Sequence, residues 1–184
     1  MKSLVKEFNT LESILNDVRG TFTSPIERTV VLLLQESIKA GRMGNYPVAA
    51  AVLDPGCKVI AKGSNSSFAP RTRSSAHAEM NAIDRFEKTE KVSDHHQLIV
   101  TLEPCLMCTS RLLLSGIKHI QFLTLDPAGG GTKYCERFPE DFKRLARGVV
   151  FTRLNVGGPL LDMGDRLYEI GERIWQEQLK LNRR

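Results

Sequence analysis

The chain of 184 residues has no apolar run of the ~18–20 residues that a membrane-spanning helix needs. Its first twenty residues are amphipathic and lack the uninterrupted apolar core of a secretory signal. Linkers, internal repeats and low-complexity segments are also missing. We therefore expect no membrane contact, a cytoplasmic location and a single domain over residues 1–184.

Cysteine is scarce, with four residues: Cys57, Cys105, Cys108 and Cys135. In a cytosolic protein, cysteines are more often metal ligands or catalytic groups than disulfide partners. The net charge of +5 is a mild basic excess, which permits contact with a polyanion without requiring it. Arg71 and Arg73 could bind a phosphate at the rim of a pocket. Six further cations suit an RNA backbone: Lys143, Arg144, Arg147, Lys180, Arg183 and Arg184. Both groups are equally typical of solvated surfaces.

The apolar spacing predicts strands that alternate with helices after an opening hairpin. We expect helices at 1–20, 24–41, 75–88, 104–115, 139–147 and 159–181, and strands at 48–53, 57–63, 97–102, 118–123 and 149–154. This order predicts an α/β fold, a three-layer α/β/α sandwich around a mixed five-stranded sheet. Gly41 is expected to end its helix, and the three glycines at 129–131 are read as a flexible bend without phosphate chemistry. Apolar stripes on the first and last helices offer surfaces for a partner subunit.

Two short motifs fall at the starts of predicted helices: His77-Ala78-Glu79 and Pro104-Cys105-Leu106-Met107-Cys108. Cys105 and Cys108 are three residues apart, so their sulfurs share one face of a first helical turn. The positive end of a helix favours thiolate over thiol. Two thiolates and the His77 imidazole make three zinc ligands and leave the fourth tetrahedral position for water, as in catalytic sites.

Glu79 lies two residues after His77, close enough to face the same cavity without coordinating the metal. Zinc lowers the pKa of a bound water from ~16 toward ~7, and a carboxylate nearby can accept its proton. The same carboxylate can pass protons to a ring nitrogen and to departing ammonia. Glu79 is therefore the predicted catalytic residue of a hydrolytic deaminase, which replaces a ring amino group with oxygen.

The pairing of His-x-Glu with Pro-Cys-x-x-Cys resembles the known signature of zinc nucleobase deaminases, in the cytidine deaminase-like superfamily (the CMP/dCMP deaminase zinc-binding family). The segments 76–79, 101–108 and 46–50 look like those of tRNA-specific adenosine deaminases and guanine deaminases. The resemblance runs from about Ser24 through the last helix. It implies the cytidine deaminase-like fold, one Zn²⁺ per chain, a homodimer, hydrolysis of a cyclic-amidine C–N bond, and substrate contacts from Asn65 and Asp126.

The substrate is less closely defined. An adenosine or guanine type is favoured, as a free base, a nucleoside or a base in tRNA. Asn81 instead resembles the deoxycytidylate deaminase form of the motif, so a cytidine- or deoxycytidylate-type substrate is the alternative. Residues 127–138 also lack the sequence that tRNA-specific enzymes usually have in this loop. Asn65 could equally form an Asx turn, and Asp126 could start a turn before Pro127. Trp175 on the last helix is expected to be a packing residue rather than a stacking platform.

Other classes of protein explain the motifs less well. A redox Cys-x-x-Cys lacks its usual thioredoxin context here. A four-ligand structural zinc site would be completed by Cys57 and Cys135, which lie singly. A zinc-stabilised nucleic-acid-binding module would be supported by a saturated four-ligand metal, and an open coordination position with ammonia release would exclude it. A non-catalytic partner subunit of a deaminase would be expected to lack Glu79.

Overall fold

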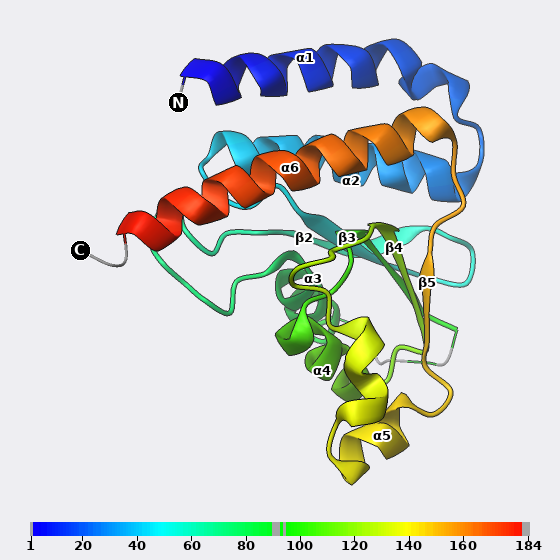
Figure 1. Ribbon diagram of the computed structural model, residues 1–184. Helices are drawn as coiled ribbons and strands as arrows, with labels where there is room; N and C mark the ends of the chain where they lie inside the picture. The colour runs from blue at the N-terminus through cyan, green and yellow to red at the C-terminus, as the bar shows by residue number, and fades with distance from the viewer. Residues whose placement is uncertain (1, 90–92, 94, 182–184) are drawn as a thin grey trace.

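A computed structural model describes residues 2–89, 93 and 95–181, built around one mixed sheet (Figure 1). Its strand order is β2-β1-β3-β4-β5. β1 is antiparallel to both β2 and β3, whereas β3, β4 and β5 run parallel. The strands are β1 Ala49–Leu53, β2 Val59–Ser64, β3 Gln97–Leu102, β4 His119–Thr124 and β5 Val150–Arg153. The predicted mixed five-stranded sheet and opening hairpin are confirmed.

Strand β1 shows why the sheet is covered on both faces. Ala49 and Ala51 belong to one apolar core and Ala50 and Val52 to the other, following the two-residue period of a strand. The whole strand is buried. Its small side chains allow helices to approach from either side, so a sandwich of layers forms around it.

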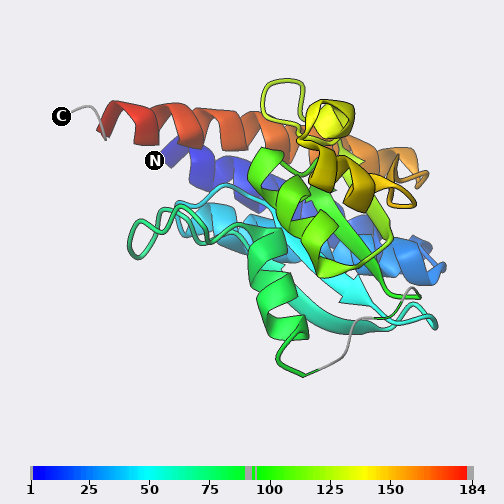
Figure 2. The same cartoon turned by 90° about the horizontal axis from the view of Figure 1, so that it is seen from below.

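Helices α2 and α6 cover one face of the sheet, and α3 and α4 cover the other (Figures 1 and 2). This confirms the predicted α/β/α sandwich. Helix α1 adds a further layer outside α2 and α6 (Figure 1). The helical segments are α1 Lys2–Val18, η1 Arg19–Thr21, α2 Pro25–Arg42, α3 Ala78–Phe86, α4 Leu106–Ser115, η2 Thr132–Arg137, α5 Glu140–Ala146 and α6 Gly158–Leu181.

The apolar stripes of α1 and α6 are used inside the chain. Phe8, Leu11 and Leu15 of α1 share a buried core with the apolar residues of α6. The end of the Phe8 ring meets Gly41, where a Cβ would lie 2.2 Å from the ring atom Cζ. The prediction that Gly41 ends its helix is wrong, because α2 continues to Arg42 and Gly41 instead makes room for Phe8.

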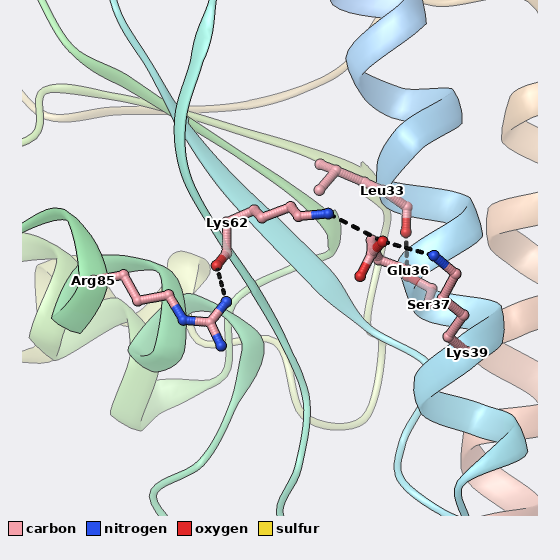
Figure 3. Close-up of polar contacts among 6 residues, drawn as sticks. All are labelled: Leu33, Glu36, Ser37, Lys39, Lys62 and Arg85. Carbon is pink, nitrogen blue, oxygen red and sulfur yellow. Dashed lines mark hydrogen bonds and ion pairs between the residues drawn. The ribbon is translucent and has the colours of Figure 1, made fainter.

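Edge strand β2 is tied to a helix on each face of the sheet (Figure 3). Lys62 Nζ lies 3.1 Å from Glu36 Oε1 of α2, which Lys39 also contacts. On the other face, Arg85 of α3 donates a hydrogen bond to the Lys62 carbonyl at 2.6 Å. These contacts hold α3, which carries part of the site, against the sheet.

The two helices that carry the motifs begin later than predicted. α3 begins at Ala78 rather than at 75, and α4 begins at Leu106 rather than at 104. His77 and Cys105 are the N-cap residues and have extended backbone angles. None of the helices in residues 2–89 and 95–181 combines the length and apolar character needed to cross a membrane.

Candidate metal centre and active site

Three predicted ligands meet between the N-termini of α3 and α4. His77 Nδ1 lies 3.6 Å from the Cys105 sulfur and 3.5 Å from the Cys108 sulfur. All three ligand atoms lie within 4.8 Å of one another. Zinc–sulfur bonds of about 2.3 Å and zinc–nitrogen bonds of about 2.0 Å, at a tetrahedral angle, place S and N about 3.5 Å apart. The three side chains therefore fit one zinc ion.

The ligand set has three members in the described part of the chain, which leaves a fourth position outside the protein. Cys57 and Cys135 are free thiols elsewhere: Cys57 contacts Gln97 at 3.5 Å, and Cys135 lies in η2. A four-ligand structural site completed by these cysteines is thus contradicted by the structure.

The surroundings of the sulfurs favour a thiolate. A hydrogen bond from the Cys108 thiol and the nearby His77 lower the pKa of Cys105 to about 4, despite burial. The reciprocal interaction with Cys105, together with burial, raises the pKa of Cys108. The start of α4 adds the partial positive charge of its unpaired N–H groups. A metal cation would complete the deprotonation of the pair, since zinc binds thiolates.

Backbone contacts position the start of α4. Gly131 N donates a hydrogen bond to the Pro104 carbonyl at 2.8 Å, and Gly130 bridges to Cys105. A Cβ on Gly131 would lie 2.5 Å from Leu106 N. The segment 129–131, which we read from the sequence as a flexible bend, is therefore a close-packed turn that supports the metal site.

Glu79 stands beside the ligand cluster without belonging to it. It is 4% exposed in the first turn of α3 and lines a cavity that His77 and Cys105 also line. Burial, reinforced by the negative charge on Cys105, raises the pKa of its carboxyl to about 7. A carboxyl group with such a pKa can both accept and donate a proton near neutral pH.

The cavity has a volume of about 540 Å³, within the range of small-molecule sites. Its walls come from the loop after β2, the strand ends, the turn after β4 and helix α6. Besides the site residues already named, it is lined by Tyr46, Val48, Asn65, Ser67, Phe68, Thr72, Ser74, Leu102, Glu103, Asp126, Ala128, Gly129, Glu172, Trp175 and Gln176.

Both predicted substrate-binding residues line this cavity, and both also shape turns. Asn65 Oδ1 accepts a hydrogen bond from Ser67 N at 3.0 Å, which is the Asx turn considered as its alternative role. Asp126 Oδ1 accepts from Ala128 N and Gly129 N at 3.1 and 2.7 Å. Their contact with a substrate stays a prediction.

Sequence reasoning missed the wall contributed by α6. Glu172, Trp175 and Gln176 line the cavity, and Tyr46 donates a hydrogen bond to Glu172 Oε1 at 2.8 Å. Trp175 packs on Phe68 and is 39% exposed, and it also lines the cavity, which the sequence did not indicate. The sequence carries no local motif at these positions, because the wall depends on where α6 crosses the sheet.

Two other groups of residues lie outside the cavity lining. Asn81, the hint of a deoxycytidylate type, donates a hydrogen bond to the Ser64 carbonyl at 2.8 Å and so ties α3 to β2. On α5 and at its C-cap, three basic residues each lie within 4.0 Å of Glu140 or Asp141: Lys143, Arg144 and Arg147. Lys180 is exposed on α6, while Arg183 and Arg184 lie outside the described residues.

Comparison with known proteins agrees with this site. Residues 24–124 match the family described as the cytidine and deoxycytidylate deaminase zinc-binding region. The chain is 38% identical over 100 residues to a tRNA-specific adenosine deaminase of Aquifex aeolicus, a match that covers 53% of this chain and 65% of that protein. The chain thus spans slightly less than two thirds of that relative.

Two solved structures share the fold. One, from work on A-to-I editing by tRNA:A34 deaminases, is 29% identical with a TM-score of 0.54, covering 62% of this chain and 92% of that one. Guanine deaminase from Nitrosomonas europaea is 23% identical with a TM-score of 0.55, covering 78% and 82%. At 23% identity, the similarity to this second structure supports the fold alone.

Proposed function

The chain belongs to the cytidine and deoxycytidylate deaminase zinc-binding family, and on that premise we propose that it is a zinc-dependent hydrolytic deaminase. The observation that carries the proposal is the buried Glu79 carboxyl beside a three-ligand site, at a cavity large enough for a nucleobase. The substrate is an adenine- or guanine-type ring, as a free base, a nucleoside or a base in tRNA. The names of the relatives and the wording of the motifs support this choice.

His77, Cys105 and Cys108 would hold the metal. When zinc is bound, it would lower the pKa of a water molecule. Glu79 accepts the proton that this water loses and delivers protons to the ring nitrogen and to the departing amino group. The balance is simple: one water is consumed, the ring carbon exchanges its amino group for oxygen, and ammonia is released. The buried position of Glu79 keeps its pKa near the pH at which both transfers are possible.

The alternative hypotheses for the substrate and the function have less support. A cytidine or deoxycytidylate substrate was suggested by Asn81, but Asn81 lies outside the cavity lining and holds the loop after β2. A non-catalytic partner subunit would be expected to lack the proton-transfer carboxylate, and Glu79 is present and buried. A zinc-stabilised nucleic-acid-binding module would need a saturated metal, whereas three ligands converge among the described residues.

The test is an ammonia-release screen of the zinc-loaded protein. It covers adenine, guanine and cytosine, their nucleosides and nucleotides, and tRNA. We expect ammonia from an adenine- or guanine-type compound. Release from cytosine compounds alone would contradict the substrate type. A folded, zinc-loaded protein that releases no ammonia from any compound would contradict the deaminase assignment itself.

We also propose a cytoplasmic location and a homodimer. Cys57 and Cys135, the two cysteines outside the metal cluster, are partly exposed free thiols, which suits a reducing compartment. The terminal apolar stripes are buried within the chain, so they cannot supply the dimer surface. Exposed Leu106, Met107 and Leu114 on α4 offer an alternative surface. Sedimentation velocity at micromolar concentration measures the oligomeric state, and a persistent monomer would contradict the homodimer.

A further inference from the structure

The cavity is strongly acidic. Four carboxylates line it, from Glu79, Glu103, Asp126 and Glu172. Its described lining contains no lysine or arginine, and His77 is committed to the metal cluster. A cleft lined by charge of one sign concentrates ligands of the opposite sign or with matching donors, and repels ligands of its own sign.

Two of these carboxylates are already occupied by the protein. Glu103 accepts hydrogen bonds from the Thr132 hydroxyl and, at 3.2 Å, from Asp126 N. Asp126 Oδ1 accepts the two backbone N–H groups of its own turn. Burial raises the pKa of Asp126, and the negative charges of Glu172 and Glu103 add to this rise.

Glu172 is held differently. Gly171 lets the Tyr46 ring approach α6 so closely that a Cβ there would lie 2.2 Å from the ring. Tyr46 then donates its hydroxyl proton to Glu172 Oε1. Burial, followed by the contact with Glu172, raises the pKa of Tyr46, so the phenol remains a donor. Within the described chain, Glu172 Oε2 receives no hydrogen bond and is available to a ligand.

An aromatic surface lies next to Glu172. Trp175 follows it by three residues, on the same side of α6, and stacks on Phe68 with ring centroids 5.9 Å apart and planes inclined by 26°. Both residues line the cavity. A flat ring can therefore contact an aromatic wall while its edge faces a carboxylate.

We propose that Glu172 is a specificity-determining residue that accepts a hydrogen bond from an uncharged donor of the substrate, so that the cavity takes an unphosphorylated purine and rejects the 5′-monophosphate. The donor is a ring N–H of a free base or a sugar hydroxyl of a nucleoside. A phosphate in the cavity would meet the carboxylates, and no lysine or arginine of the lining would balance its charge. This inference rests on the proposed function and narrows its substrate to a free base or a nucleoside, because a base in tRNA carries phosphates on both sides of its sugar.

A specific rival exists on the loop after β2. Arg71 and Arg73 flank Thr72, which lines the cavity, and both are exposed. If they bind a phosphate at the rim, the monophosphate would bind more tightly than the nucleoside. The experiment must therefore separate an acceptor on α6 from cations on this loop.

The test measures binding by isothermal titration calorimetry to the zinc-loaded protein. Hypoxanthine, inosine and inosine 5′-monophosphate form one series, since they carry no amino group to release. Guanine, guanosine and its 5′-monophosphate form the second, measured in Glu79→Gln to suppress turnover. We expect the base or the nucleoside to bind at least about tenfold more tightly than the monophosphate in one series.

The variants assign this preference to α6. Glu172→Gln should weaken the better ligand by about tenfold, as expected for loss of a hydrogen bond to a charged group. Glu177→Gln, which removes the same charge from an exposed position of α6 outside the cavity, should leave binding unchanged. Tyr46→Phe should give a smaller loss, because Glu172 keeps its charge but loses its positioning partner. Zinc content and thermal unfolding show that each variant is folded.

The outcomes are separable. Weaker binding of the base alone assigns a ring N–H to Glu172, and weaker binding of the nucleoside alone assigns a sugar hydroxyl. The inference is overturned if the monophosphate binds as tightly as its nucleoside, if Glu172→Gln behaves like Glu177→Gln, or if no ligand in either series binds. Loss of monophosphate binding in Arg71→Ala would favour the rim. A screen without any ammonia release would defeat the proposed function, whereas the binding results above decide the role of Glu172 separately.

Discussion

At the scale of single residues, the different roles proposed for Glu79 and His77 follow from their positions at the start of α3. His77 is the N-cap residue of α3 and faces the two sulfurs, whereas Glu79 is the second residue of the helix and faces the cavity. A spacing of two residues at a helix start therefore separates the proposed metal ligand from the proposed proton carrier. The two roles can be tested independently.

Replacement of Glu79 by glutamine should stop turnover without releasing zinc. The amide keeps the size of the side chain but cannot accept a proton, so kcat/KM should fall by roughly 10²–10⁴-fold. Zinc content measured by atomic absorption should stay at one ion per chain. Asp84→Asn, an exposed change on the same helix, is the control and should keep activity. Loss of zinc from Glu79→Gln would show that Glu79 is itself a ligand.

The site residues were predictable to the extent that they lie in short motifs. Residues 77–79 and 105–108 carry their chemistry in local spacing, and the structure brings them together. The contact between Tyr46 and Glu172 joins residues 126 positions apart, and its chemistry is visible only after α6 crosses the sheet. Trp175 belongs to the same wall, and the apolar pattern of its helix does not indicate this position.

At the scale of elements, α6 has two functions. Its apolar face fills a core with α1 and α2, and its polar side forms a wall of the cavity. Gly171 connects the two, since it brings Tyr46 against the helix at the boundary between core and cavity. Because α6 both packs in the core and lines the cavity, a change in its packing should affect the stability of the fold and the shape of the site together.

Gly171→Ala should therefore cost both stability and binding. The new Cβ collides with the Tyr46 ring, and overpacking of this kind destabilises by roughly 1–3 kcal/mol. Gly158→Ala on the same helix meets no atom within 4 Å and should change the free energy of unfolding by less than about 0.5 kcal/mol. Urea unfolding measures both variants. Equal stabilities would contradict the packing described for Tyr46.

Element types were predicted well, and their ends less well, for physical reasons. The starts of α3 and α4 are set by residues with extended backbone angles at the metal cluster, not by helix propensity. Gly41 and Gly131 were interpreted from the flexibility of glycine. In the structure both serve close approach, to Phe8 and to the backbone of Leu106, and such contacts depend on tertiary packing.

At the scale of the whole molecule, the metal site is a cross-link. His77 begins α3 and the two cysteines begin α4, so one ion joins two helices on the same face of the sheet. Binding to the folded state alone shifts the unfolding equilibrium toward that state. Metal occupancy should then be visible in global stability as well as in activity.

Removal of zinc should lower the melting temperature of the protein. A ligand present at a thousand times its Kd stabilises the folded state by about 4 kcal/mol, so a chelator should produce a clear decrease in calorimetry. Cys105→Ser should abolish the zinc-dependent part of the shift. Cys135→Ser, outside the cluster, should retain it. An identical melting temperature with and without zinc would refute the cross-link.

The stack of Phe68 on Trp175 has an optical consequence. Trp175 is the single tryptophan of the chain, and it lines the cavity. All indole fluorescence of the protein thus originates at the place where a purine would sit. An arriving ring should quench this emission, so the protein carries a built-in, label-free signal of occupancy that needs neither turnover nor a modified ligand.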